Sequence, residues 1–358
     1  MEVSMIDLNQ SLAERLHRIP GYVPGMPAHR MDDVTFMDEL EAMWGRNWGA
    51  QSCIGELRTV LLSRPDVEGP SEEELADPAF FVRFGRTATD LPRGDLRVKQ
   101  YDEMVALLKS EGVEVIETHY SAERKKGIYT SRARGLGLEP IIVKGGAIIH
   151  RAAVAWKRGP ERAISEFLVN LGCPILFTVH GSGIHEVGGN ILFLDSKHAI
   201  QATSLSTNME GIRQVSFILE LVGIKEQHIA HLPSYLNTMY GRSAAMGFHL
   251  VNVLNMVAEK LAVCYPGALP YETLRYMQSK GIRLIEAPEE EALNQACNTL
   301  ALRAGEIIMA AGNPITTAAL RREGVRVIEL EMATSRFGSG PRCQIRDMVR
   351  DDGPSLDD

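Results

Sequence analysis

The stretch YDEMVALLKSEGVEVIE, residues 101–117, decides the fold because its pattern occurs five times along the chain. Apolar residues such as Met104, Leu107 and Leu108 recur at helical spacing, Gly112 then fits a left-handed helix C-cap, and a β-rich run follows. The other copies carry their glycines at the same junction, at Gly172, Gly223, Gly281 and Gly324. The pattern therefore predicts five helix–Gly–strand units.

A further strand-like run precedes each of the five helices. These runs cover residues 56–65, 139–152, 190–203, 260–269 and 306–314. Two of them contain hairpin-like turn sequences, KGGA and LDSKHA. Closing five strand–strand–helix–strand units into a ring would bury the edges of every unit. We therefore expect an α/β fold, a five-bladed α/β propeller with pseudo-five-fold repeats.

The repeat also predicts the domain organisation. A chain of 358 residues would by length alone suggest two domains. Five units of one ring cannot be divided in that way, so residues 53–348 are expected to form a single catalytic domain. Residues 1–52 lie outside the repeat and are expected to be an extension or a lid. The acidic tail, residues 349–358, is expected to be disordered.

Composition limits the possible partners and the cellular compartment. Hydrophobic residues make up 45% and charged residues 23%, as in globular proteins. The net charge of −8, with no basic block interleaved with aromatics, disfavours nucleic acid. No apolar run of signal-peptide or membrane-spanning length occurs. Scattered cysteines without a CxxC pair favour a reduced, cytoplasmic setting. The expected partner is a small-molecule substrate, and a homo-oligomer is left open.

Cys343 is the first candidate for chemistry, in the stretch SRFGSGPRCQIRD. Gly338 and Gly340 would let the backbone approach a ligand closely. The neighbouring cation Arg342 would favour the thiolate, which is the nucleophilic form of cysteine. The other four thiols lie in apolar stretches and are expected to be core residues: Cys53, Cys173, Cys264 and Cys297.

His249 and the segment HGSGIHEVGGN, residues 180–190, are the other candidates. His249 could act as general acid and base, although a lone histidine among apolar residues is more often part of a core. Gly189 suggests a tight turn at the mouth of a site, with Glu186 and Asn190 as polar groups that could orient a substrate.

A metal site in the same segment is the alternative for its histidines. His180, His185 and Glu186 could be ligands, but their spacing is not HExxH, so no metal is expected. The chain also contains no GxGxxG, GxxxxGK[ST] or GxSxG motif. No organic cofactor is therefore expected, and a serine hydrolase is disfavoured.

Four segments together resemble the guanidine-modifying superfamily, which includes arginine deiminases, dimethylarginine hydrolases and glycine amidinotransferases and has the pentein fold. HLVNVLNMVAEKLAVCYP resembles the deiminase HLDT stretch, and GSGPRC resembles GGPRC. EVGGNILFLDSKHAIQATSLSTN resembles the EGGD hairpin, and GIYTSRARGLGLEPIIVKGGAIIHRA resembles the TRD element. The resemblance implies that Cys343 is the nucleophile and His249 the acid–base, and it places Arg132 near the substrate.

Departures from the superfamily pattern concern the groups that hold arginine. The carboxylates that would clamp a guanidinium fall on Ala133, Val251 and Val187, with Glu186 one place away. The arginines that would hold an α-carboxylate fall on Ser206 and Gly338. A buried guanidinium without a counter-charge is costly. The pattern therefore implies a substrate other than arginine, such as an acylated guanidine, an amidine or a ureide.

These residues predict a cysteine-dependent hydrolase of carbon–nitrogen bonds. In this hypothesis Cys343 forms a covalent intermediate, and His249 protonates the leaving nitrogen and then activates water. Glu186, Asn190, Gly189, Arg132 and Arg342 would contact or orient the substrate, and His231 is the reserve for His249. An amidinotransferase, with an amine in place of water, and a non-catalytic binding module are the alternatives.

Overall fold

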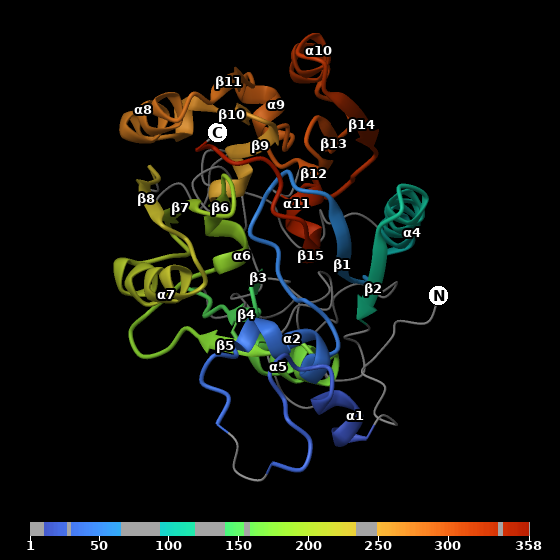
Figure 1. Ribbon diagram of the computed structural model, residues 1–358. Coiled ribbons are helices and arrows are strands. Elements are labelled where there is room, and N and C mark those ends of the chain that lie inside the picture. Colours follow the sequence, from blue (N-terminus) through green and yellow to red (C-terminus); the bar gives the residue numbers. More distant parts are fainter. Residues whose placement is uncertain are drawn as a thin grey trace.

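The computed structural model describes residues 11–26, 30–65, 94–118, 140–153, 158–233, 249–335 and 339–357. The strands in these ranges form five sheets of three strands each. Figure 1 shows the sheets following one another around the molecule, each with a helix on its outer side. The chain is thus a mixed α/β fold made of repeated small sheets. Within the described residues, no helix has the length and apolar character needed to cross a bilayer.

Each sheet has the same plan, which is an antiparallel strand pair, then a helix, then a third strand parallel to the central one. The second unit contains β3 (Ile141–Val143), β4 (Gly146–Ile149), α5 (Pro160–Asn170) and β5 (Ile175–Thr178), and the third contains β6 (Ile191–Phe193), β7 (His198–Thr203), α7 (Met209–Leu221) and β8 (Glu226–His231). The fourth contains β9 (Leu254–Ala258), β10 (Leu261–Cys264), α8 (Tyr271–Ser279) and β11 (Arg283–Glu286). The fifth contains β12 (Leu300–Arg303), β13 (Glu306–Ala310), α10 (Pro314–Arg322) and β14 (Arg326–Leu330).

The first sheet joins the two ends of the repeat. Its strands are β1 (Leu57–Ser63), β2 (Glu114–Thr118) and β15 (Ile345–Arg350). The helix α4 (Gly94–Ser110) lies between β1 and β2 in the chain. Leu62 pairs with Ile345 and Leu57 with Arg350 in an antiparallel register. The last strand therefore completes the first sheet.

The junction glycines behave as the sequence predicts. All five have positive φ angles, between 71° and 99°, in the left-handed region that suits glycine: Gly112, Gly172, Gly223, Gly281 and Gly324. Each amphipathic helix packs its apolar face on its sheet, as Met104 and Leu108 of α4 do in a fully buried cluster. The prediction of five helix–Gly–strand units is confirmed.

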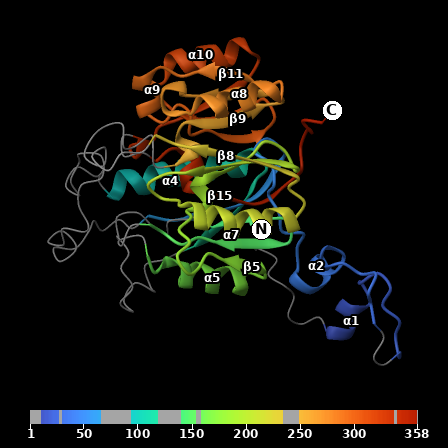
Figure 2. The same ribbon diagram turned by 90° about the vertical axis from the view of Figure 1, so that its left-hand side faces the viewer.

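Short helices outside the sheets connect the units and approach the site. They are α1 (Leu12–Leu16), α2 (Phe36–Trp44), α6 (Val187–Asn190), η9 (Leu250–Asn252), η10 (Pro266–Ala268), α9 (Glu289–Leu293) and α11 (Pro341–Gln344). Figure 2 shows α1 and α2 beside the lower sheets. Trp48, which follows α2, is buried and donates its indole N–H to the carbonyl of Gly172, 2.8 Å away. This part of the N-terminal segment packs on the second sheet, and its role as a lid stays a prediction.

The acidic tail is ordered, so the expectation of a disordered tail is wrong for residues 351–357. Asp352 pairs with Lys144 at 2.9 Å, and Asp357 pairs with Lys197 at 2.9 Å. The backbone N–H of Leu356 donates to Asp195 at 2.7 Å, and the Leu356 side chain packs on the main core. The acidic residues that suggest disorder in isolation find basic partners on the second and third sheets.

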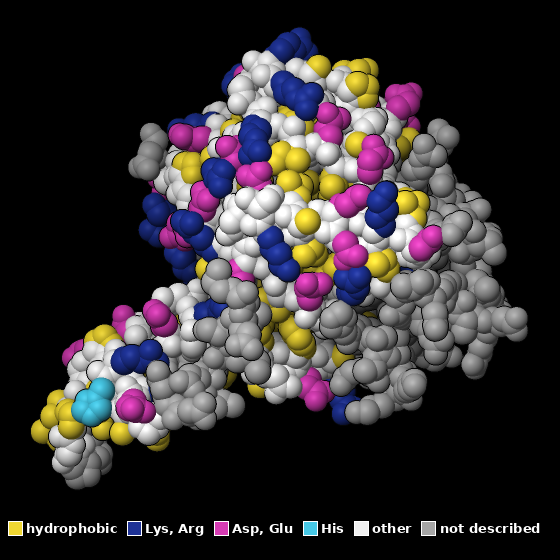
Figure 3. All heavy atoms as spheres, turned by 90° about the vertical axis from the view of Figure 1, so that its right-hand side faces the viewer, with side chains coloured by type: hydrophobic (Ala, Val, Ile, Leu, Met, Phe, Trp, Pro, Cys, Tyr) yellow, Lys and Arg dark blue, Asp and Glu magenta, His cyan; other side chains and the backbone are white. Residues whose placement is uncertain are grey.

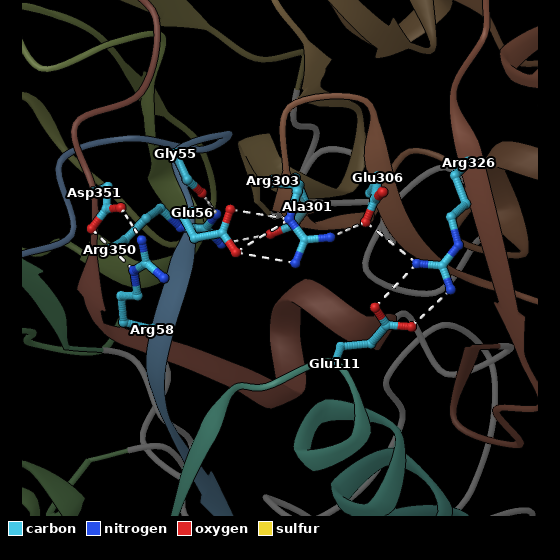
Figure 4. Close-up of polar contacts among 10 residues, drawn as sticks. All are labelled: Gly55, Glu56, Arg58, Glu111, Ala301, Arg303, Glu306, Arg326, Arg350 and Asp351. Atoms are coloured by element: carbon cyan, nitrogen blue, oxygen red, sulfur yellow. Dashed lines mark hydrogen bonds and ion pairs between the residues drawn. The ribbon is translucent and has the colours of Figure 1, made fainter.

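A chain of ion pairs links the first sheet to the fifth (Figure 4). Arg303 contacts Glu56 at 3.0 Å and also pairs with Glu306. Arg326 contacts Glu306 at 3.3 Å and Glu111, at the end of α4, at 2.8 Å. On the face in Figure 3, Lys and Arg side chains are interspersed with Asp and Glu. Arg303 is thus a central link between the two neighbouring sheets.

Arg303→Ala is expected to lower the free energy of unfolding by about 1 kcal/mol at low salt, because the side chain is partly exposed and solvent screens the pairs. The loss should shrink in about 1 M salt, where charges are screened within roughly 3 Å. Urea unfolding at both salt concentrations measures it. Arg275→Ala, at an exposed position on α8, is the matched control. An equal loss at both salt concentrations would assign the effect to packing instead.

Candidate active site

Cys343 lies in α11, the single turn that leads into β15. It is half-buried, whereas the other four cysteines are buried. Burial raises the pKa of Cys264 to about 12 and raises the pKa values of Cys53, Cys173 and Cys297 as well. Those four thiols are therefore neutral packing groups, and the prediction that they belong to the core is confirmed.

Two asparagine side chains contact the Cys343 sulfur. The amide Nδ2 of Asn298 donates to Sγ at 2.9 Å, and Asn298 Oδ1 accepts the backbone N–H of Cys343 at 3.2 Å. Sγ also lies 3.5 Å from Oδ1 of Asn252, which can accept the thiol proton. Neither amide could be predicted from the sequence, because an isolated asparagine ahead of a strand carries no motif.

His249 and Glu186 form a buried pair. Nε2 of His249 lies 2.7 Å from Oε2 of Glu186, and both side chains are almost completely buried. Val187, the position on which the resemblance puts the superfamily's glutamate, is instead packed in the apolar core. The structure therefore places the carboxylate of Glu186, one residue earlier, against the candidate acid–base.

Gly189 leaves the space that the His249 ring occupies. A Cβ atom at position 189 would lie 2.5 Å from Cγ of His249, well inside van der Waals contact. Gly189 therefore acts by its lack of a side chain. The short helix α6, which contains this glycine, packs directly against η9, which follows His249.

Asn190 connects the third sheet to the His249 segment. Its Nδ2 donates to Ser206 at 2.7 Å and to Thr207 at 2.9 Å, while its Oδ1 accepts the N–H of Leu250 at 3.1 Å. These bonds fix the residue next to His249. The role predicted for Asn190 in orienting a substrate stays a prediction.

Three buried arginines and one buried aspartate lie along α11 and β15. Arg342 and Arg350 both contact Asp347, at 3.5 Å and 3.1 Å, and Arg346 donates to the carbonyl of Gly188 at 3.2 Å. Burial opposes ionisation of Asp347, but these three arginines hold the pKa of its carboxyl below the ordinary value. Arg342 also interacts electrostatically with Cys343, and this cationic surrounding favours a thiolate.

The remaining sequence candidates lie elsewhere. Arg132 is outside the described residues. His231, at the end of β8, bonds to Thr203 at 2.9 Å. His180 is exposed, whereas His185 is fully buried and burial lowers its pKa to about 4, so that it is neutral at neutral pH. Over the part of the chain that the structure describes, no three His, Cys, Asp or Glu residues converge as metal ligands would.

Part of this chain matches a known family, and nearly all of it matches a known enzyme. The sequence profile of the arginine deiminase family matches residues 245–350, which include His249, Asn298 and Cys343. The chain is also 24% identical to a 2-nitroimidazole nitrohydrolase of Mycobacterium sp. strain JS330. The alignment of 362 positions covers 96% of this chain and 94% of that relative.

Solved structures share the fold at low sequence identity. The N-terminal domain of ArgZ, a cyanobacterial arginine dihydrolase, superposes with a TM-score of 0.66 at 15% identity, covering 84% of this chain and all of that one. DDAH of Pseudomonas aeruginosa, in complex with citrulline, superposes with a TM-score of 0.59 at 21% identity, covering 82% of this chain and all of that one. These likenesses show that the chain has a mixed α/β fold like that of the two solved structures.

Proposed function

We propose that this chain, which belongs to the guanidine-modifying superfamily, is a hydrolase that uses Cys343 to displace nitrogen from a planar carbon. One observation carries the proposal. The half-buried thiol of Cys343 is held by an amide donor beside three buried arginines, while His249 is paired with Glu186. The five sheets and the β1–β15 pairing support a closed five-bladed propeller around this site.

The reaction proceeds in two steps, which are formation of a thiol-bound intermediate and its hydrolysis. The Cys343 thiolate forms a bond to the planar carbon, and the leaving nitrogen departs with its bonding electron pair, taking a proton from His249 where it needs one. Water then attacks the thiol-bound carbon, His249 accepts the water proton, and the carbon–sulfur bond breaks to restore the thiolate. The net change replaces one nitrogen substituent by oxygen. Glu186 holds the His249 ring for both transfers.

The substrate that fits best is uncharged. Val251 and Val187, at two positions where the superfamily carries carboxylates, are buried apolar side chains. Two polar contacts of the sulfur are made by the neutral amides of Asn252 and Asn298. Because no carboxylate at these positions would balance a buried guanidinium, its desolvation would go uncompensated there.

The substrate must offer a planar carbon that bears a leaving nitrogen, and it must carry no positive charge. A carbon bonded to three nitrogens in an uncharged compound meets both requirements. An acylated guanidine has such a carbon, because the acyl group makes the guanidine far less basic. 2-Nitroimidazole has one too, since its ring carbon C2 carries two ring nitrogens and the nitro nitrogen, and the nitro group can leave as nitrite. The full-length similarity to a 2-nitroimidazole nitrohydrolase favours this compound among the candidates. Acylated guanidines and guanylurea, which is a carbamoylguanidine, share a carbon bonded to three nitrogens. Amidines and other ureides carry only two nitrogens on that carbon and are the further candidates.

A substrate panel tests the proposal with the purified full chain. 2-Nitroimidazole, an acylguanidine, guanylurea and arginine are each incubated with the enzyme, and nitrite, ammonia and urea are measured. We expect turnover of an uncharged member and little turnover of arginine. A higher kcat/KM for arginine would overturn the substrate assignment. Ping-pong kinetics that require an amine acceptor would identify an amidinotransferase instead.

A further inference from the structure

We propose that Asn298 is a positioning residue that keeps Cys343 in its reactive thiolate form, an inference that rests on the proposed function for its catalytic meaning. Asn298 lies between α9 and β12, in the fifth unit, and reaches the sulfur from outside α11. It belongs to none of the segments on which the superfamily resemblance rests.

The contact with Cys343 is made at two points. Nδ2 of Asn298 donates to the sulfur at 2.9 Å, and Oδ1 accepts the Cys343 N–H, which is shared with the carbonyl of Gly340. A distance of 2.9 Å is typical of N–H···O bonds, and sulfur is larger than oxygen, so the donor is pressed closely on the sulfur. Donation to an ionised acceptor is stronger than donation to a neutral one, and the contact therefore favours the thiolate.

The orientation of the Asn298 amide is fixed by its surroundings. The side chain is fully buried, and its Nδ2 also faces Oδ1 of Asn252 at 2.9 Å and the carbonyl of Val251 at 3.3 Å. A Cβ at Gly340 would come within 2.7 Å of Asn298 Oδ1, so the turn before Cys343 closes over the amide. Flipping the amide would set its N–H groups against the Cys343 N–H. The donor is thus held toward the sulfur.

Asn252 complements this donor. Its Oδ1, 3.5 Å from the sulfur, can accept the proton when Cys343 is a thiol, whereas Asn298 donates when it is a thiolate. Asn252 follows His249 by three residues and ends η9. The two amides thereby connect the nucleophile to the segment that carries the acid–base.

Charged groups lie on the elements that carry the thiol and the acid–base. Arg342, Arg346, Asp347 and Arg350 belong to α11 and β15, and the Glu186–His249 pair lies before α6 and beside η9. Arg342 interacts electrostatically with Cys343, whereas Asn298 donates a hydrogen bond directly to its sulfur. Removing Asn298 leaves all of these charges in place, so its contribution can be measured separately.

The experiment measures the rate at which iodoacetamide alkylates Cys343 as a function of pH, with Cys343→Ser protein as the background. In Asn298→Ala we expect the rate at pH 7 to fall about tenfold and the midpoint of the profile to rise by about one pH unit, since a hydrogen bond to a charged group is lost. In Asn298→Asp, which keeps the shape but replaces the donor by a carboxylate, the midpoint should rise further.

Asn294→Ala is the matched control, because Asn294 is an amide of the same segment that bonds to Ala311 and Ser335. Its alkylation profile should equal that of the wild type. The thiolate absorbance near 240 nm, compared between wild type and Cys343→Ser, tests the wild-type protein directly. An unchanged profile in a folded Asn298 variant, or a wild-type midpoint at or above the ordinary cysteine value of about 8.5, would overturn the inference.

Alkylation needs no substrate, so the inference and the proposed function can fail separately. A shifted profile in a protein that turns over no member of the substrate panel would sustain the role of Asn298 and remove the proposed function. Turnover that survives Cys343→Ala would remove the proposed function whatever the alkylation profile shows.

Discussion

Replacing Cys343 with serine or alanine is expected to lower kcat by roughly 10³- to 10⁶-fold, the range typical of removing a catalytic nucleophile. The reason is chemical, since a serine hydroxyl stays protonated at neutral pH and is a far weaker nucleophile than a thiolate, and alanine supplies no nucleophile. In the serine variant Asn298 can still donate to the hydroxyl oxygen, so the fold around α11 should be kept. Steady-state turnover of the best panel substrate measures the loss.

Cys173→Ala provides the matched control for this prediction. Cys173 is fully buried in the second sheet's core, and burial raises its pKa, so its thiol takes no part in the reaction. The variant should lose some stability and keep its kcat. If Cys343→Ala retains wild-type turnover, the covalent mechanism is wrong.

The second large effect is expected at His249. His249→Ala should lower kcat about 10²- to 10⁴-fold, the usual range for a general acid–base, and should slow hydrolysis of the intermediate most. With a leaving group such as nitrite, which needs no proton, bond formation to Cys343 can still occur. Intact-mass measurement should therefore detect the thiol-bound adduct in this variant.

Glu186→Gln separates proton transfer from ring orientation. The amide is nearly isosteric and can still bond to Nε2 of His249, so the loss should be smaller than in His249→Ala. The effects of the two changes should not add, because both act through one ring.

Normal kinetics in His249→Ala, with no adduct, would contradict the role of His249 and make His231 the next candidate for the acid–base.

Much of the fold follows from local pattern. Helical spacing, a glycine such as Gly112 at a left-handed cap, and a β-rich run are properties of short segments, and each recurs in the structure. The order of the tail could not be predicted, because Leu356 and Asp357 depend on Asp195 and Lys197, which are distant in sequence.

The site was less accessible from sequence than the fold. Motifs identified Cys343 and His249, since each lies in a recognisable segment. Whether Glu186 or Val187 faces His249 depends on how the backbone turns at the start of the short helix α6. There the Glu186 side chain contacts His249, and the Val187 side chain packs in the core. Asn298 depends on contact across the repeat, and no local pattern reports such a contact.

The pairing of β1 with β15 has a consequence for biosynthesis. Residues 57–63 leave the ribosome early, but their antiparallel partner, residues 345–350, is translated last among the strands. Contacts so distant in sequence form late and slowly. The nascent chain must therefore carry an exposed strand edge through most of its translation, and Cys343, which immediately precedes β15, takes its place only when that edge is covered.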